Sequence, residues 1–175
     1  MRLVEGVASV ADTDAFVAAL QAVGDDHGCA VQALDARLVA GRDHLEAAVE
    51  HARRSFVRGE NVARDPAVEV LLYAAGRRQI TRALELGVSE GETPAVVVVD
   101  ALRHYGDAAG DGGDEDAAAQ AVRDLGALTP ASALDRTDEA AVRAVFDVSE
   151  RERAATAASL SALVCERVAL LDVEK

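Results

Sequence analysis

The chain has few aromatic residues, almost no lysine and few cysteines. Its 175 residues include three Phe, two Tyr, no Trp and two Cys, and its only lysine is Lys175. A core must therefore be built from Val, Leu, Ile and Ala. Cys29 and Cys165 lie far apart and form no CxxC motif, so the sequence predicts two small buried side chains rather than a zinc site or a redox pair.

Long apolar runs are also missing. No segment reaches the length of about 18 apolar residues that a membrane helix needs. The first residues, MRLVEGVASVADTD, are too acidic and too short in apolar length for a signal peptide. We therefore expect a cytoplasmic protein with no membrane partner.

Positive charge is scarce as well. The chain has 31 acidic and 18 basic side chains, which gives a formal net charge of −13. Such a charge disfavours non-specific binding to nucleic acid or to an anionic membrane, because the net field repels phosphate. Many acidic residues, abundant Ala and Val, and arginine in place of lysine predict a salt-adapted protein of halophilic archaeal type. A GC-rich coding bias is an alternative source of part of this skew.

Length and apolar content predict one folded domain over residues 1–175. The hydrophobic patterning predicts an α+β (mixed α/β) fold, with a small central sheet of three to four strands flanked by about six helices. We expect strands at 2–10, 29–34 and 94–100, and helices at 13–23, 42–58, 66–75, 77–86, 115–125, 138–146 and 150–165. The segment 167–173 is compatible with either a last helical turn or a closing strand.

Several helix ends have local signals. Asp65 and Pro66 are a typical N-cap and first helical residue, and Gly24 is expected to end the first helix. Ser149 and Glu152 have the spacing of a capping box. The helix expected at 77–86 would bury three apolar side chains, namely Ile80, Ala83 and Leu84.

No motif for catalysis or cofactor binding is present. GxSxG, GxxxxGKS/T, HExxH and GxGxxG are all missing, so we expect no catalytic residue, no cofactor and no metal. His44 and His51 are seven residues apart on one expected helix, a spacing that favours histidines at the solvent-facing side or the flank of the helix over a metal pair. His27 and His104 are expected in loops.

The segment 105–116, YGDAAGDGGDED, is the one low-complexity stretch and is expected to be a flexible acidic loop. A calcium site is the alternative, with four possible ligands, Asp107, Asp111, Asp114 and Asp116. The spacing of these residues does not match an EF-hand loop.

Residues 37–82 reverse the charge of the rest of the chain. This segment has nine arginines and six carboxylates, for a net charge of +3, whereas the remainder has nine cations and 25 acids, for −16. Arg77 and Arg78 are expected in the first turn of a helix, where cations oppose the dipole and free amides suit a phosphate. The alternative is that these arginines only form ion pairs with nearby acids, namely Glu46, Glu50, Glu69 and Glu85.

Two further features suggest binding surfaces. Tyr73 falls off the apolar stripe of its expected helix, which predicts an exposed platform for base stacking beside arginine. The alanine-rich helix at 150–165 has apolar residues on more than one face. One side would pack on its own domain, and the other would meet either a partner or more of the same domain.

The run Asn61–Ile80, NVARDPAVEVLLYAAGRRQI, resembles a known signature, NIA…E.LLY.SGERQI. This signature is typical of the kinase-binding regulatory subunit of the KEOPS (EKC) complex, the family that includes the eukaryotic PRPK-binding protein, TPRKB. The segments 41–58 and 166–173 are also similar to that family, so the resemblance spans nearly the whole chain. Ala75 replaces a frequent Ser of the signature, and Arg77 replaces a frequent Glu.

The resemblance implies an accessory protein and not an enzyme. Such a subunit binds and activates the small atypical kinase of KEOPS, within a larger complex whose catalytic subunit transfers a threonylcarbamoyl group to an adenosine of tRNA. Archaeal members are expected to recruit tRNA through its single-stranded 3′ CCA end. Two alternatives remain at this point: a protein adaptor without RNA binding, and a small enzyme that binds an anionic metabolite at Arg78.

The resemblance and the charge pattern together give candidate site residues. Matching the signature places Asn61, Tyr73, Arg78 and Gln79 at the tRNA end, and charge alone adds Arg53, Arg54, Arg64 and Arg77. On the C-terminal helix, the candidates for contact with the kinase are Leu160, Leu163 and Val164.

Overall fold

A computed structural model describes residues 1–104 and 112–173, with only the backbone described for 103 and 104. It contains one four-stranded sheet in the order β2-β3-β1-β4, in which all neighbouring strands are antiparallel. The strands are β1 (Arg2–Val10), β2 (Ala30–Asp35), β3 (Gly91–Asp100) and β4 (Leu128–Pro130). The predicted single α+β domain with a small sheet is confirmed.

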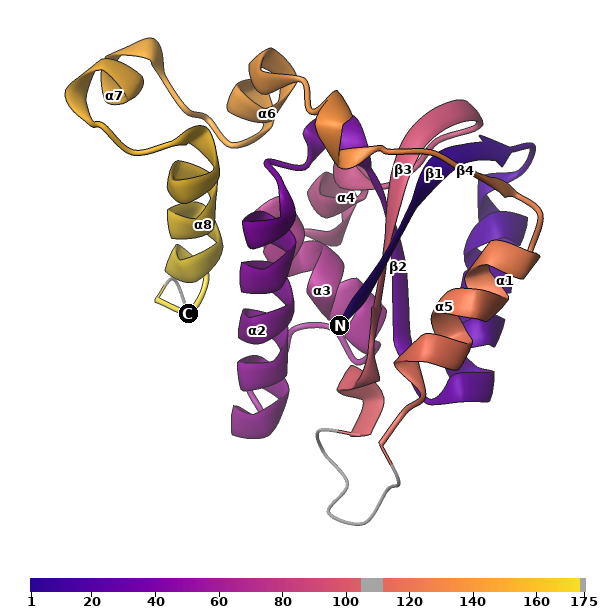
Figure 1. The fold of residues 1–175 in the computed structure, drawn as a ribbon. Coiled ribbons are helices and arrows are strands. Elements are labelled where there is room, and N and C mark those ends of the chain that lie inside the picture. The colour runs from indigo at the N-terminus through magenta and orange to yellow at the C-terminus, as the bar shows by residue number, and fades with distance from the viewer. Residues whose placement is uncertain (105–111, 174–175) are drawn as a thin grey trace.

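The sheet separates two layers of helices (Figure 1). Helices α1 (Thr13–His27) and α5 (Glu115–Asp124) cover one face, and α2 (Arg42–Arg58) and α3 (Pro66–Ala75) cover the other. Helix α8 (Leu160–Leu170) packs against the outer side of α2 and forms a further layer. A residue at the end of α8 can therefore contact α2 and α3 although it is about 100 residues away in sequence.

Strand β3 lies in the middle of the sheet and contributes to both cores. Val96 and Val98 belong to the core under α2 and α3, whereas Val97 and Val99 belong to the core under α1 and α5. All four are at most 1% exposed. Their continuous apolar run is thus explained by burial on both faces.

The remaining elements are short. They are the helices α4 (Ile80–Ala83), α6 (Glu139–Val145) and α7 (Glu150–Ala155), and the 3-10 helices η1 (Ala36–Leu38), η2 (Leu84–Leu86), η3 (Ala101–His104) and η4 (Leu134–Arg136). The described residues thus form eight α-helices, of which α4 and α7 have at most six residues. Strand β4 was not predicted, because its three residues show no periodicity.

Local capping explains why the starts of α3 and α7 were predicted well. The Asp65 carboxylate accepts a hydrogen bond from the Ala67 amide (2.8 Å), and Gly76 ends α3 in the left-handed conformation, with φ of 59°. At α7, the Ser149 hydroxyl accepts from the Glu152 amide (3.1 Å), which is one half of the predicted capping box. The Glu152 carboxylate pairs with Arg167 (2.7 Å).

The predicted end of the first helix is wrong. Helix α1 continues through Gly24 to His27, and Gly28 ends it with φ of 65°. Gly24 is a close-packing position, since a Cβ there would lie 2.6 Å from the Cys29 carbonyl oxygen. Because Gly24 has no side chain, the backbone just before β2 can pack closely against α1. Gly24 does not end the helix.

The helix predicted at 77–86 is also wrong. The turn at Gly76 leads the chain out of α3, so Arg77 and Arg78 lie in a connection and only Ile80–Ala83 is α-helical. Ala83 is buried, whereas Ile80 and Leu84 are 47% and 58% exposed. The dipole argument for a phosphate site therefore does not apply to these arginines.

The alanine-rich C-terminal helix is interrupted. Helix α7 ends at Ala155, and Ser159 starts α8 by accepting a hydrogen bond from the Ala162 amide (3.1 Å). Between them, the Thr156 hydroxyl accepts from the Ala158 amide. These side chains compete with helical hydrogen bonding. Helix α8 runs to Leu170, so the helical interpretation of the last segment holds over the described residues.

The acidic segment 105–116 is only partly described. Residues 105–111, with Asp107 and Asp111, lie outside the described residues. Asp114 caps α5 through the Ala117 amide (2.9 Å), and Asp116 pairs with Arg2 (2.6 Å). The end of the predicted flexible loop is therefore the ordered start of a helix.

Candidate functional site

The signature segment begins with a loop held by a buried carboxylate. Glu69, on α3, is 1% exposed and accepts hydrogen bonds from the Ser55 hydroxyl (3.0 Å) and from the Ala63 amide (2.8 Å). The Val62 amide also donates to it. A buried charge is tolerated only with such partners. Glu69 thereby fixes the connection between α2 and α3 and does not pair with an arginine.

Tyr73 is buried, which contradicts the predicted stacking platform. Its side chain is 4% exposed, its hydroxyl donates to an Asp172 carboxylate oxygen at 2.7 Å, and its ring stacks on His51. Burial, together with the nearby Asp172 carboxylate, raises the pKa of Tyr73. Tyr73 is therefore part of the core beneath α8, and no base can stack on it in this arrangement.

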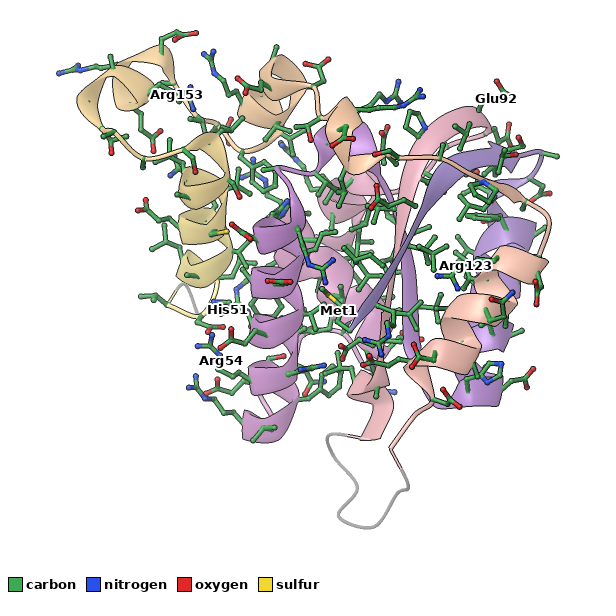
Figure 2. All side chains as sticks on the ribbon, in the orientation of Figure 1. Met1, His51, Arg54, Glu92, Arg123 and Arg153 are labelled. Carbon is green, nitrogen blue, oxygen red and sulfur yellow. The ribbon has the colours of Figure 1, made fainter. Side chains whose placement is uncertain are left out.

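Asp172 joins the chain after α8 to α2 and α3. Its second carboxylate oxygen lies 2.8 Å from His51 Nδ1. Burial opposes the ionisation of Asp172, but the hydrogen bonds from Tyr73 and His51 together hold its pKa below the ordinary value. Figure 2 shows His51 and Arg54 on the side of α2 where α8 ends.

Arg78 completes this set of contacts. Its guanidinium donates to the Leu171 carbonyl oxygen, and its Nε is buried without a hydrogen-bond partner. Carbonyls at a helix C-terminus need such donors. We call the group that holds the end of α8 the C-terminal clasp; its members are His51, Tyr73, Arg78, Leu171 and Asp172.

An open depression lies on the other side of Arg78. It is lined by three arginines, one amide and one carboxylate: Arg77, Arg78, Gln79, Arg82 and Asp147. We call it the arginine depression. Arg77 donates to the Asp147 carboxylate (2.7 Å) and to the Val145 carbonyl (2.8 Å), which ties it to α6. Three guanidinium groups against one carboxylate leave this surface positively charged.

A smaller apolar pocket adjoins the depression. Its lining includes Val62, Leu72 and Leu171 beside Arg77 and Arg78, and Val62 is 49% exposed. Sequence reasoning missed Val62, Leu171 and Asp147 as parts of this surface. Val62 lies within the signature and could have been proposed from it. Asp147 has no local signal, because its partner Arg77 is 70 residues earlier.

The other predicted tRNA-binding residues do not join this surface as expected. Arg53 binds the fully buried Asp100 through Nε (3.0 Å) and Nη2 (2.5 Å), so its charge is neutralised inside the fold. Arg54 pairs with Glu50 on α2 (3.0 Å). Asn61 donates to the Ala63 carbonyl within its own loop (2.9 Å), and Arg64 is exposed.

The alternative that the arginines only form ion pairs is partly correct. Arg54 pairs with Glu50, as described, and Arg42 pairs with Glu46 (2.8 Å). Exposed pairs one helical turn apart contribute little to stability. Glu69 does not take part, since its oxygens bind the α2–α3 connection. The arginine depression is the surface where cations outnumber acids.

The three residues predicted to contact the kinase are buried. Leu160, Leu163 and Val164 are at most 7% exposed and pack with residues of α6 and the turn after it, namely Val142, Phe146 and Val148. They stabilise the position of α8 within its own domain. The outer face of α8 instead presents Ala162, Glu166 and Leu170, of which Leu170 is 49% exposed.

The prediction of solvent-facing histidines on α2 is wrong, because both are buried. His44 Nδ1 accepts from the Ala40 amide (3.1 Å), so Nε2 carries the proton and donates to the Ala74 carbonyl (2.7 Å). Burial lowers the pKa of His44 to about 4. Cys29 is fully buried as predicted, whereas Cys165 is partly exposed.

A comparison with known protein families identifies the family of this chain. A family model described as kinase binding protein CGI-121 matches residues 9–172. The chain belongs to this family. The match confirms the resemblance to the kinase-binding subunit of KEOPS, and it extends from the end of β1 to Asp172, so that all members of the C-terminal clasp lie within it. No curated protein matches the sequence.

Membership of the CGI-121 family gives the chain a kinase partner. Within the part of the chain that the structure describes, no three His, Cys, Asp or Glu side chains are grouped to hold a metal ion. In the same residues, no helix has both the length and the apolar character to cross a membrane.

Proposed function

We propose that this CGI-121 family member is a non-catalytic, cytoplasmic subunit of the KEOPS complex. It binds and activates the atypical kinase and recruits tRNA through its 3′ CCA end for threonylcarbamoyladenosine modification. The observation that supports tRNA recruitment is the arginine depression, an open and positively charged surface on an otherwise acidic chain. Its residues Arg77, Arg78 and Gln79 belong to the signature segment.

The chemistry of the depression suits a single-stranded RNA end. Arginine guanidinium groups bind phosphate through paired N–H donors. Beside the depression, the half-exposed side chain of Val62 offers an apolar surface against which an unstacked base can pack. The excess of acid elsewhere would repel the rest of the RNA, which favours a local contact over non-specific binding.

Replacing Arg82 tests the RNA contact without disturbing the clasp. Arg82 is exposed on α4 and lines the depression. We expect Arg82→Glu to weaken tRNA binding roughly tenfold at low salt, because a cation that faces phosphate becomes an anion. Fluorescence anisotropy with tRNA that has or lacks its 3′ terminal nucleotides measures this change.

Arg123→Glu is the matched control for Arg82→Glu. Arg123 is also exposed but lies on α5, in the opposite layer (Figure 2). If both variants weaken tRNA binding equally, the effect is one of general charge. If the wild-type chain binds the kinase but not tRNA, the alternative of a protein adaptor without RNA binding is supported.

For the kinase, we propose the outer face of α8 as the contact surface. It combines the small side chain of Ala162 with the exposed apolar side chain of Leu170. Leu170→Glu should prevent co-elution with the kinase, because a buried charge at an interface is costly. Val17→Glu is the control, since Val17 is 51% exposed on α1, far from α8 in the fold. Normal co-elution of Leu170→Glu would exclude this face.

A further inference from the structure

Asp147 is the only acidic residue that lines the arginine depression. It follows α6 and has φ of 52°, and it is the one non-glycine residue with positive φ in the described part of the chain. This conformation is uncommon for non-glycine residues, although Asp and Asn tolerate it best. Here it belongs to a common helix C-terminal motif, in which the Val148 amide donates to the Arg143 carbonyl oxygen (2.9 Å). The turn places the Asp147 carboxylate beside Arg77.

The carboxylate of Asp147 has the contacts that an anionic ligand would have. Arg77 Nη2 lies 2.7 Å from its Oδ2. The hydrogen bond from Arg77 lowers the pKa of Asp147 most, and the nearby charges of Arg82 and Arg167 lower it further. Guanidinium groups from the α3–α4 connection, from α4 and from α8 therefore all act on this one carboxylate.

The contact is also accessible and easily exchanged. The side chains of Asp147 and Arg77 are 76% and 35% exposed. Exposed ion pairs of this kind are weak, because both groups are well hydrated. Arg77 also donates to the Val145 carbonyl, a backbone contact that does not involve the carboxylate. Arg77 would thus stay in place while its anionic partner changes.

We propose that the Asp147 carboxylate occupies the position of an RNA phosphate in the arginine depression and competes with it. Because the proposal rests on tRNA recruitment at this surface, it specifies how that binding is regulated. A phosphate that enters the depression displaces Asp147 from Arg77. The internal carboxylate lowers the affinity for any phosphate, so that RNA also needs the apolar contact at Val62 to bind.

Asp147→Asn tests this competition. Asn has nearly the same shape and tolerates positive φ, but it lacks the charge. We expect the variant to bind tRNA roughly threefold to tenfold more tightly at low salt, because Arg77 becomes available to phosphate. The slope of log affinity against log salt should become steeper by about 0.7, the value for one more phosphate contact on a single strand.

Glu150→Gln is the matched control. Glu150 is 79% exposed and pairs with Arg143 at 2.5 Å, so this variant also removes one carboxylate from an exposed ion pair. It lies outside the lining of the depression, and we expect less than about a twofold change in affinity. Both variants should co-elute with the kinase like the wild type.

The outcomes separate the two proposals. Tighter binding with a steeper salt slope for Asp147→Asn alone supports the competition. If Asp147→Asn binds tRNA as the wild type does or more weakly, while Arg82→Glu weakens binding as expected, the competition is overturned but tRNA recruitment is not. If neither the wild type nor any variant binds tRNA, tRNA recruitment is overturned, and the competition with it.

Discussion

The C-terminal clasp and the arginine depression share Arg78 but differ in how their polar groups are used. In the clasp, Tyr73 and Asp172 are largely buried and satisfy each other, and they hold α8 in place. In the depression, Arg82 is exposed, and the carboxylate that pairs with Arg77 is exposed as well. One signature thus contains residues for stability and residues for binding. A shared motif does not mean a shared role.

Acid should act on the buried His44 of α2 and have little effect on the exposed ion pair of the depression. The folded-state pKa of His44 is depressed to about 4, so the unfolded chain takes up this proton first as pH falls. The free energy of unfolding should therefore fall by roughly 3 kcal/mol between about pH 6.5 and pH 4. Urea unfolding at several pH values measures the loss. His44→Gln should reduce it, whereas Asp147→Asn should leave it unchanged.

Arg78 contributes to both regions, so its removal should affect both tRNA binding and stability. We expect Arg78→Ala to weaken tRNA binding and also to lower the free energy of unfolding by about 2 kcal/mol, because the Leu171 carbonyl loses a charged donor. Arg82→Ala should weaken binding but change stability by less than about 0.5 kcal/mol. Paired anisotropy and urea titrations distinguish them. Equal stability of the two variants would contradict a structural role for Arg78.

The same substitution in each region gives the finest comparison. Asp172→Asn should lower the free energy of unfolding by about 1.5 kcal/mol, since two hydrogen bonds to a charged acceptor become neutral. Asp147→Asn should cost less than about 0.5 kcal/mol, as expected for an exposed pair. Chemical unfolding at neutral pH measures both. A larger loss for Asp147→Asn would reverse our assignment of the two regions.

Features with local signals were predicted from the sequence, and features set by distant contacts were not. Asp65 and Gly76 cap the two ends of α3 through contacts within a few residues. The run of valines in β3 places apolar side chains on both faces of the sheet. The burial of Tyr73 depends on Asp172, which is 99 residues later. The partner of Arg77 is similarly remote. Helical periodicity correctly placed Tyr73 off the α3 stripe, but α8 covers that side of the helix.

The signature contains residues that the fold brings to one surface, but it does not give the position of each residue. Arg77, Arg78 and Gln79 do line one surface. Arg53 does not, because a buried Asp100 from β3 neutralises it. Likewise, Leu163 and Val164 were expected to be available to a partner, but α6 packs against them. The charge and apolar character of residues in a sequence do not show which side chains are paired or buried within the fold and which remain available to a partner.

The central place of β3 has a consequence for biosynthesis. Its partners β1 and β2 leave the ribosome some 60 to 90 residues earlier and have no strand to pair with until Gly91–Asp100 emerges. During that interval their edges are open to pairing with other chains. The first 90 residues have 14 acidic and 10 basic side chains, a net charge of −4, so mutual repulsion between such chains is weak in this interval. Most of the acidic excess, 17 acidic against eight basic side chains, follows Glu90 and is synthesised only with and after β3.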